Sequence, residues 1–155
     1  MVGNYMAENT NPNPLAKHFR QPAIYIKLPS GGAWNDETSI KATPNEEYAV
    51  YPMTALDEIS YRTADALFNG SAVADVIKSC IPDIIDPWQI STADLDTLLI
   101  AIRIASFGHD MDFTSRCPSC EETNDFGIDL REILEQIKMP DFSEPVVNGD
   151  MTIYF

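Results

Sequence analysis

Three cysteines are the residues of this 155-residue chain whose type and spacing best suit chemistry. Cys117 and Cys120 form a CxxC pair, a spacing at which two thiolates can bind zinc from one turn. Because zinc in structural sites takes four ligands, this pair is only half of a site. Further ligands could come from Cys80, from Glu121 and Glu122, or from a second subunit. The candidate metal ligands are therefore Cys117, Cys120 and Cys80, and zinc is the only candidate cofactor.

Two other interpretations of the CxxC pair remain open. The pair can be the turn of a β-hairpin with reduced thiols, or a redox-active dithiol, which would make the protein a thiol oxidoreductase. A thioredoxin-like pair lies at the start of a helix, where the dipole lowers the thiol pKa, whereas the residues after Cys120 alternate as in a strand. The odd, low cysteine count also argues against a disulfide framework. These observations weaken the redox interpretation and retain zinc and the structural turn.

Histidines and carboxylates do not form a catalytic motif in this sequence. The two histidines, His18 and His109, have no GxSxG or comparable nucleophile motif beside them. If residues 109–117 are extended, His109 lies about 26 Å from the CxxC turn, at about 3.3 Å per residue. Solvated helix-start and strand faces explain the two acidic pairs, Asp94 with Asp96 and Asp110 with Asp112. The sequence therefore predicts a protein that is not an enzyme.

The chain is strongly acidic. Its 24 Asp and Glu against 10 Lys and Arg give a formal charge of −14, with −1 on residues 1–52 (4 basic, 5 acidic) and −13 on residues 53–155 (6 basic, 19 acidic). Nucleic-acid binding depends on clustered Lys and Arg, so no nucleic-acid partner is predicted. No stretch approaches the roughly 20 apolar residues that cross a bilayer, and no signal peptide is present. We expect a cytosolic protein without membrane insertion.

The surrounding elements predict an α+β fold in two parts. Residues 1–22 are rich in proline and asparagine and predict an extended N-terminal arm. Residues 23–155 predict a single α+β domain, with a small antiparallel sheet and about four helices. Strands are expected at 23–28, 39–42 and 47–51, helices at 54–69, 71–79, 92–107 and 130–138, and a packed loop at 81–90. A CxxC-tipped β-hairpin is expected at about 109–128, and a second hairpin at 146–154 turns at Asn148-Gly149.

Large apolar side chains outside the expected core are candidates for partner contacts. Trp34 and Trp88 lie in expected loops beside turn residues, and large aromatic side chains often dominate interface energies. Either tryptophan could instead cover part of a small core. The arm adds three further candidates: Tyr5, Leu15 and Phe19. The final strand is expected either to join the sheet or to continue into a segment beyond Phe155.

Several segments, in order, resemble the baseplate hub and hub-assembly protein family of T-even-type contractile-tailed bacteriophages. The resemblance covers about residues 23–155. The Pro-rich arm of this chain is not a hallmark of the family. The segments that carry it are Leu28–Gly32; Val50–Thr54 with Asp57-Glu58; Ile77–Ile81; Asp94–Asp96 with Leu98-Leu99 and Ile102-Arg103; Phe107-Gly108; and Cys117–Cys120.

This resemblance implies a non-enzymatic structural or assembly component of the tail baseplate hub. Such a protein would lie in the virion tail baseplate, and in the host bacterial cytoplasm during assembly. Its partners would be other phage baseplate and tail proteins in a hetero-oligomeric assembly. Family members continue past the final strand, which allows for a missing C-terminal portion here. Two alternatives remain: a small zinc-binding adaptor, and an acidic assembly chaperone that is not retained in the particle.

Overall fold

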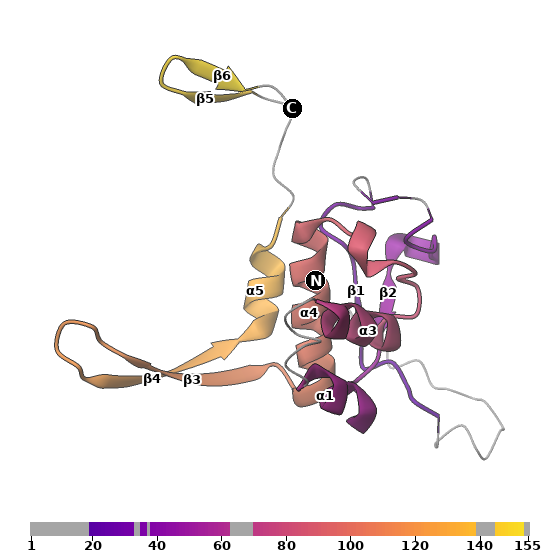
Figure 1. Cartoon of the computed structure of the whole chain (residues 1–155), viewed down its shortest axis with the longest axis horizontal. Coiled ribbons are helices and arrows are strands. Elements are labelled where there is room, and N and C mark those ends of the chain that lie inside the picture. The colour runs from indigo at the N-terminus through magenta and orange to yellow at the C-terminus, as the bar shows by residue number, and fades with distance from the viewer. Residues whose placement is uncertain (1–18, 33–34, 37, 63–69, 139–144, 154–155) are drawn as a thin grey trace.

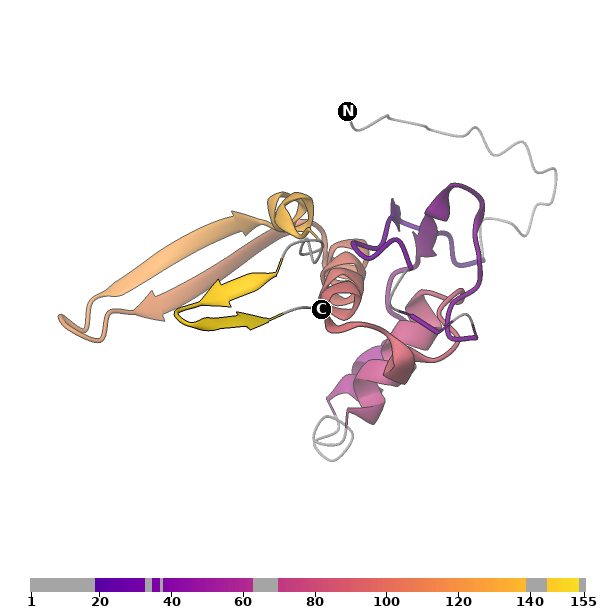
Figure 2. The same ribbon diagram turned by 90° about the horizontal axis from the view of Figure 1, so that it is seen from above.

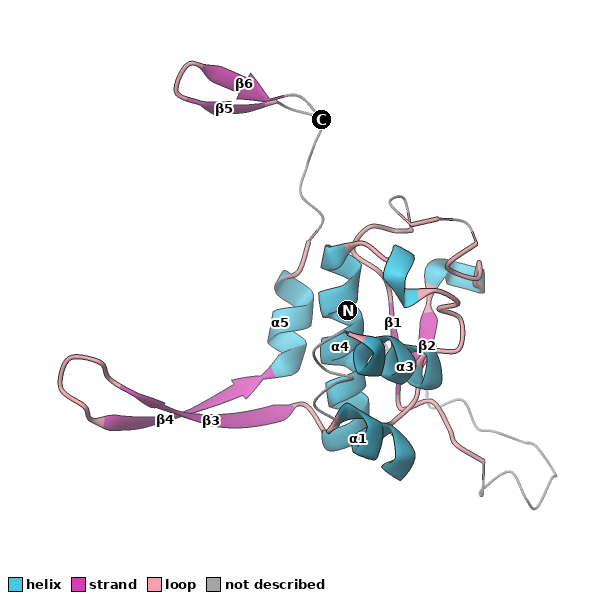
Figure 3. Cartoon of the chain, viewed as in Figure 1, coloured by secondary structure: helices cyan, strands magenta, loops and turns pink. Residues whose placement is uncertain are grey.

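The computed structural model describes residues 19–32, 35–36, 38–62, 70–138 and 145–153 (Figure 1). These residues form four α-helices and three separate two-stranded antiparallel sheets (Figure 3). The predicted α+β class is therefore confirmed, although the predicted small sheet is one of three two-stranded pairs. None of the helices in these ranges is long and apolar enough to cross a membrane.

The first sheet pairs β1 (Ile24–Ile26) with β2 (Tyr48–Val50), in a register that sets Ile24 against Val50. Alternation along both strands turns Ile26, Tyr48 and Val50 into the core and leaves Tyr25 exposed. A short 3₁₀ helix, Pro44–Glu46, precedes β2. The predicted extended piece at 39–42 contributes only one isolated bridge, from Ile40 to Ile84.

Helix α1 (Ala55–Tyr61) begins at a capping box in which Thr54 and Asp57 bond to each other's backbone N–H. Two large apolar side chains of this helix do not face the core. Leu56 is 71% exposed and Ile59 is 65% exposed. The remainder of the predicted helix, residues 63–69, lies outside the described residues.

Helix α3 (Ser71–Cys80) begins at Ser71, a residue that the sequence suggested as its N-cap. Gly70, at φ 74°, is the N-cap, and Ser71 is the first helical residue. Val76 and Ile77 are buried, as expected, and the α3 face packs against α1 and α4. The following loop is packed as predicted, with Ile81 and Ile84 buried and a 3₁₀ turn at Pro87–Gln89.

Helix α4 (Thr92–Phe107) is the centre of the core. Ser91 caps its start by accepting from the Asp94 N–H, and Gly108, at φ 86°, ends it. The helix packs against α3, α5, β1 and β2. Its buried Leu98 and Ile102 belong to the same apolar cluster as residues from β1, β2 and α3.

Asp94 contradicts the expectation of a solvated helix start, because its side chain is fully buried. Its carboxylate accepts hydrogen bonds from the Ser30 N–H at 3.0 Å, from the Ser30 hydroxyl and from the Asn35 amide at 2.7 Å. The Asn35 amide oxygen in turn accepts from the Ser91 N–H at 2.8 Å. Asp94 therefore joins the turn after β1 to the start of α4.

The predicted arm, residues 1–22, includes Arg20, whose side chain contacts the body. Arg20 lies against the body, where its guanidinium donates to the Ser79 carbonyl at 2.8 Å, to the Pro52 carbonyl and to the Cys80 sulfur at 3.2 Å. It also forms an ion pair with Asp57 at 3.8 Å. Residues 1–18 of the arm lie outside the described residues.

The second half of the chain carries two hairpins. Strands β3 (Asp110–Arg116) and β4 (Thr123–Asp129) form a long ribbon that projects from the helical body, and α5 (Leu130–Gln136) returns along α4 (Figures 1 and 2). Strands β5 (Val146–Asn148) and β6 (Met151–Ile153) pair only with each other within the described residues.

The turn between β5 and β6 is shifted by one residue from the prediction. Asn148 pairs with Met151, so the two turn residues are Gly149 and Asp150. Gly149 has φ 60° and Asp150 does not have a positive φ. Glycine at the first turn position is typical of the type II′ hairpin turn, whose twist matches that of the strands.

Candidate functional site

The β3–β4 hairpin is the candidate functional site, because it carries the CxxC pair at its tip and projects from the core (Figure 2). Its ladder runs from Asp110 opposite Asp129 to Arg116 opposite Thr123. Within the described chain no further strand pairs with either of its edges. A two-stranded hairpin by itself is marginally stable in water, so this ribbon is suited to being covered by a partner.

The two faces of the hairpin differ in chemistry. Because side chains alternate along a strand, Phe113 and Phe126 share one face with Met111 and Ile128. The two phenyl rings stack with centroids 5.3 Å apart, and Phe126 is 47% exposed. We call this surface the apolar face; the opposite, acidic face carries Asp110, Asp112, Asp125 and Asp129.

The backbone edges of the hairpin can be assigned from its end bonds. The Cys117 N–H donates to the Glu122 carbonyl and the Leu130 N–H to the His109 carbonyl, both at 2.9 Å. Hydrogen-bonded and non-bonded pairs alternate in an antiparallel ladder. The outward-pointing backbone groups therefore belong to the pairs between them: residues 110, 112, 114 and 116 on β3, and 123, 125, 127 and 129 on β4.

The tip places Cys117 and Cys120 in one closed turn. The Glu121 N–H donates to the Cys117 carbonyl at 2.9 Å, and Glu121 takes a positive φ of 60°. Arg116 reinforces the turn through the Glu121 carbonyl at 3.1 Å and the Glu121 carboxylate at 2.7 Å. The Cys120 and Ser119 N–H groups, together with the Cys120 thiol, lower the pKa of the Cys117 thiol.

Cys80 lies apart from the other two cysteines. Its thiol is fully buried in the apolar cluster at the end of α3, and burial raises its pKa. The β3–β4 turn lies at the far end of the molecule from α3 (Figure 1). The structure therefore brings Cys117 and Cys120 together and does not bring Cys80 to them.

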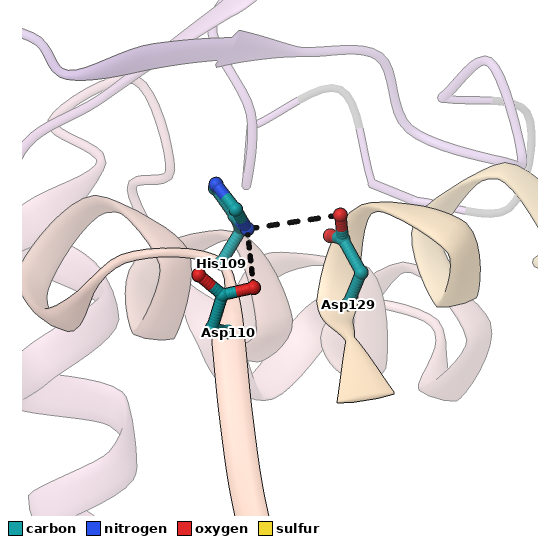
Figure 4. Close-up of side chains that lie close together, drawn as sticks. All are labelled: His109, Asp110 and Asp129. Atoms are coloured by element: carbon teal, nitrogen blue, oxygen red, sulfur yellow. Dashed lines mark ion pairs between the residues drawn. The ribbon is translucent and has the colours of Figure 1, made fainter. Parts of the chain in front are cut away.

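The base of the hairpin holds a group of charged side chains that the sequence did not single out (Figure 4). His109 Nδ1 lies 3.1 Å from Asp110 Oδ1 and 3.7 Å from Asp129 Oδ2, so a protonated His109 forms ion pairs with both. Potential ligand atoms of these three residues lie within 4.8 Å of one another. Arg131, however, already donates to both carboxylate oxygens of Asp129. The group is therefore an ion-pair network that joins β3 to the start of α5.

The replacement Arg131→Met is expected to raise the pKa of Asp129 from about 2 towards its usual value of 3.8. The Arg131 side chain and N–H donate to the carboxylate, and the guanidinium charge stabilises its ionised form. Because this folded-state pKa is depressed, the contribution to stability is present above about pH 4 and is lost as the pH falls towards 2. Carbon-13 NMR titration of the Asp129 carboxyl measures the change.

Arg116→Met is the matched control, because Arg116 forms a similarly exposed ion pair with Glu121 at the other end of the hairpin. We expect it to leave the titration of Asp129 unchanged. A titration midpoint for Asp129 that does not move in Arg131→Met would contradict the assigned cause of the low pKa.

The predicted partner contacts fall into two groups. Phe19 and Trp88 are exposed, at 61% and 62%. The Trp88 ring also packs over Gly70, where an added Cβ would lie 2.9 Å from the Cη2 atom of the ring. Tyr5, Leu15 and Trp34 lie outside the described residues. The structure adds Phe113 and Phe126, whose only signal in the sequence is the alternation of apolar residues along β3 and β4.

Comparison with known proteins agrees with the resemblance seen in the sequence. A model of the family of T4 bacteriophage base plate proteins matches residues 22–155, which include every described strand and helix. No curated protein and no solved structure gives a significant match. The chain belongs to the T4 bacteriophage base plate protein family.

Proposed function

We propose that this protein is a non-enzymatic structural or assembly component of the phage tail baseplate hub, where it docks onto neighbouring baseplate subunits through the β3–β4 hairpin. Membership of a base plate protein family supports the structural role and a location in the virion tail. The observation that carries the docking proposal is the hairpin itself, which projects from the core with an apolar face and two open edges.

Strand addition is the docking mode that these edges favour. An unpaired edge presents a row of N–H and C=O groups that a partner strand can bind, and side chains on alternate positions then provide specificity. On β3 these groups belong to residues 110, 112, 114 and 116, while Phe113 faces the same partner from the apolar side. One strand of a neighbouring subunit would thus bind the outward backbone groups of β3 and also contact Phe113.

The acidic charge of the hairpin indicates which kind of neighbouring subunit could bind it. Residues 110–129 contain six acidic side chains and one basic side chain, a net charge of −5. Opposite charge on the partner would speed association and select the register, whereas like charge would oppose it. We therefore propose a partner surface with Lys or Arg beside an edge strand.

Other exposed apolar side chains supply further contacts. Leu56 and Ile59 lie on α1, and Trp88 and Ile85 lie on the loop before α4; all four are exposed. Tyr5, Leu15 and Phe19 of the arm, and Trp34, remain proposed contacts as well. The exposed side chains on α1 and on the loop before α4 are separate from the hairpin, which fits a subunit held by more than one neighbour in a hetero-oligomeric assembly.

Proline substitutions at the hairpin edges test the proposal. Asp112→Pro removes an outward N–H from β3, and Asp125→Pro does the same on β4, while the internal ladder is retained. We expect at least one of them to lower incorporation of the full chain into co-produced baseplates by about tenfold, equivalent to about 1.4 kcal/mol of binding. The amount of this chain in purified baseplates, measured by quantitative mass spectrometry, is the readout.

Alanine at the same positions provides the matched controls. Asp112→Ala and Asp125→Ala remove the same charges and keep the backbone N–H groups, so they should be incorporated better than the proline variants. Circular dichroism checks that all four variants are folded. If neither proline variant differs from its alanine control, docking by strand addition at this hairpin is wrong.

The acidic charge also favours a second candidate, an assembly chaperone in the bacterial cytoplasm that leaves before the particle is complete. A formal charge of −14 and exposed apolar side chains suit transient binding of a basic, aggregation-prone partner. The same mass spectrometry distinguishes the two functions. A chaperone would be abundant in assembly intermediates and absent from finished tails, whereas a structural component would be present in both.

A further inference from the structure

The hairpin tip presents two thiols in a preorganised arrangement. Cys117 is half-buried and Cys120 is exposed, and both are free thiols. Two backbone bonds close the turn between them, from the Cys117 N–H to the Glu122 carbonyl and from the Glu121 N–H to the Cys117 carbonyl. Arg116 adds a bond to the Glu121 carbonyl. Both sulfur atoms are thus held by local bonds at the end of the ribbon, where another molecule can reach them.

The Cys117 sulfur lies among donors that stabilise a thiolate. The backbone N–H groups of Cys120 and Ser119 donate hydrogen bonds to it. Thiolate is the form that binds a metal. Hydrogen bonds to a ligating atom also orient it and tune the metal, so the turn supplies the outer contacts that a metal-bound thiolate requires.

The tip lacks the remaining ligands of a zinc site. Among the described residues, the one group of three or more potential ligands with atoms close together is His109, Asp110 and Asp129, at the opposite end of the hairpin. Cys80 is buried in the core, and Glu121 is bound to Arg116. Since structural zinc takes four ligands, two are needed beyond those that the described residues bring to the tip.

We propose that two copies of this chain bind one Zn²⁺ between their hairpin tips, through Cys117 and Cys120 of each copy. A two-fold axis through the metal supplies the same pair of thiolates twice, which gives the Cys₄ set that structural zinc sites use. Within the part of the chain that the structure describes, a single copy supplies only half of this site. It does not depend on the proposed docking, because the edges of β3 and β4 remain open when the tips meet.

Charge makes the association dependent on the metal. Each hairpin, residues 110–129, carries a net charge of −5, so two tips without metal repel each other. Binding of Zn²⁺ to the four cysteines releases their four thiol protons, and the zinc–thiolate bonds supply the attraction that overcomes this repulsion. We therefore expect a monomer without zinc and a dimer with it.

Native mass spectrometry of the reduced, full-length protein tests the proposal, with zinc sulfate added or with EDTA. The expected result is one zinc ion per two chains, and a monomer without zinc after chelation. X-ray absorption at the zinc edge should show four sulfur ligands at about 2.3 Å. Cys117→Ser and Cys120→Ser should each abolish both zinc binding and the dimer.

Two variants serve as controls. Ser119→Ala changes a tip side chain but keeps the N–H that bonds to Cys117, and Cys80→Ala removes the core thiol; both should retain the zinc-bound dimer, with circular dichroism confirming that they are folded. A zinc-free protein under these conditions would overturn the proposal, as would one zinc per monomer with two sulfur ligands. A dimer that persists in Cys117→Ser, or a Cys117–Cys120 disulfide in reducing buffer, would also overturn it.

Discussion

Replacing Asp94 with alanine is expected to lower the free energy of unfolding by about 4 kcal/mol, since each buried polar group left without a partner costs about 1–3 kcal/mol. The variant would remove the acceptor for three donors: the Ser30 N–H, the Ser30 hydroxyl and the Asn35 amide. Asp94 is fully buried and Ser30 is 9% exposed, so water cannot easily replace the carboxylate. Urea unfolding followed by circular dichroism measures the loss.

Two further variants sharpen this result. Asp96 lies two residues along the same helix and is exposed, so Asp96→Ala should change stability by no more than about 0.5 kcal/mol. Asp94→Asn keeps one acceptor oxygen but turns an NH₂ group towards existing donors, and should lose about 2 kcal/mol. A loss below about 1 kcal/mol in Asp94→Ala, the typical effect of a point mutation, would show that Asp94 does not hold the Ser30 turn to α4.

Replacing Arg20 with alanine is expected to lower the free energy of unfolding by about 2 kcal/mol, because hydrogen bonds to charged groups contribute about 1.5–3 kcal/mol each and this side chain is partly solvated. The Arg20 side chain is 27% exposed, and its guanidinium joins three parts of the body: the Pro52 carbonyl, the end of α3 at Ser79, and Asp57 on α1. Without it, the Pro52 carbonyl and Asp57 lose a partner. The same urea titration measures the change.

Chain shortening provides an independent test of Arg20. A chain that begins at Arg20 should be as stable as the full chain, whereas one that begins at Gln21 should show the same loss as Arg20→Ala. Lys27→Ala is the charge-matched control, because Lys27 is exposed on the segment after β1 and should lose no more than about 0.5 kcal/mol. Equal stability of the two shortened chains would contradict the anchoring role of Arg20.

Elements with local signals could be predicted from the sequence. Helix α4 begins at Ser91 and ends at Gly108 because a capping hydroxyl and a glycine at positive φ act within one turn of the chain. The alternation of Met111 and Phe113 predicted β3 for the same reason, since side-chain direction depends only on position along the strand. The CxxC pair at the tip followed from its place between two alternating segments.

Two predicted boundaries were wrong by one residue, because two adjacent residues could each form the turn or the helix cap. The segment Asn148-Gly149-Asp150 can turn at either of two adjacent pairs, and pairing of Asn148 with Met151 selected Gly149 as the first turn residue. Similarly, Gly70 rather than Ser71 caps α3, because glycine adopts the left-handed conformation at little cost. Each correction moves a boundary by one residue and leaves the element intact.

Contacts between distant segments could not be read from the sequence. Asp94 looked like an ordinary acidic residue of a helix start, and only the approach of Ser30, 64 residues earlier, buries its carboxylate. Arg20 likewise meets Ser79 across 59 residues. Helical periodicity placed Leu56 and Ile59 on one face, but it did not say what that face meets, and the structure leaves it exposed.

The sequence by itself determined the α+β class, the position of the helices and hairpins, and the place of Cys117 and Cys120 in one turn, because each depends on groups that are neighbours along the chain. The tertiary structure decided that Cys80 is in the core, that the hairpin stands away from it, and that Asp94 and Arg20 hold the body together. These outcomes depend on which parts of the chain pack against one another and so bury their surfaces from water. That burial is set by packing across the whole fold and not by any short segment.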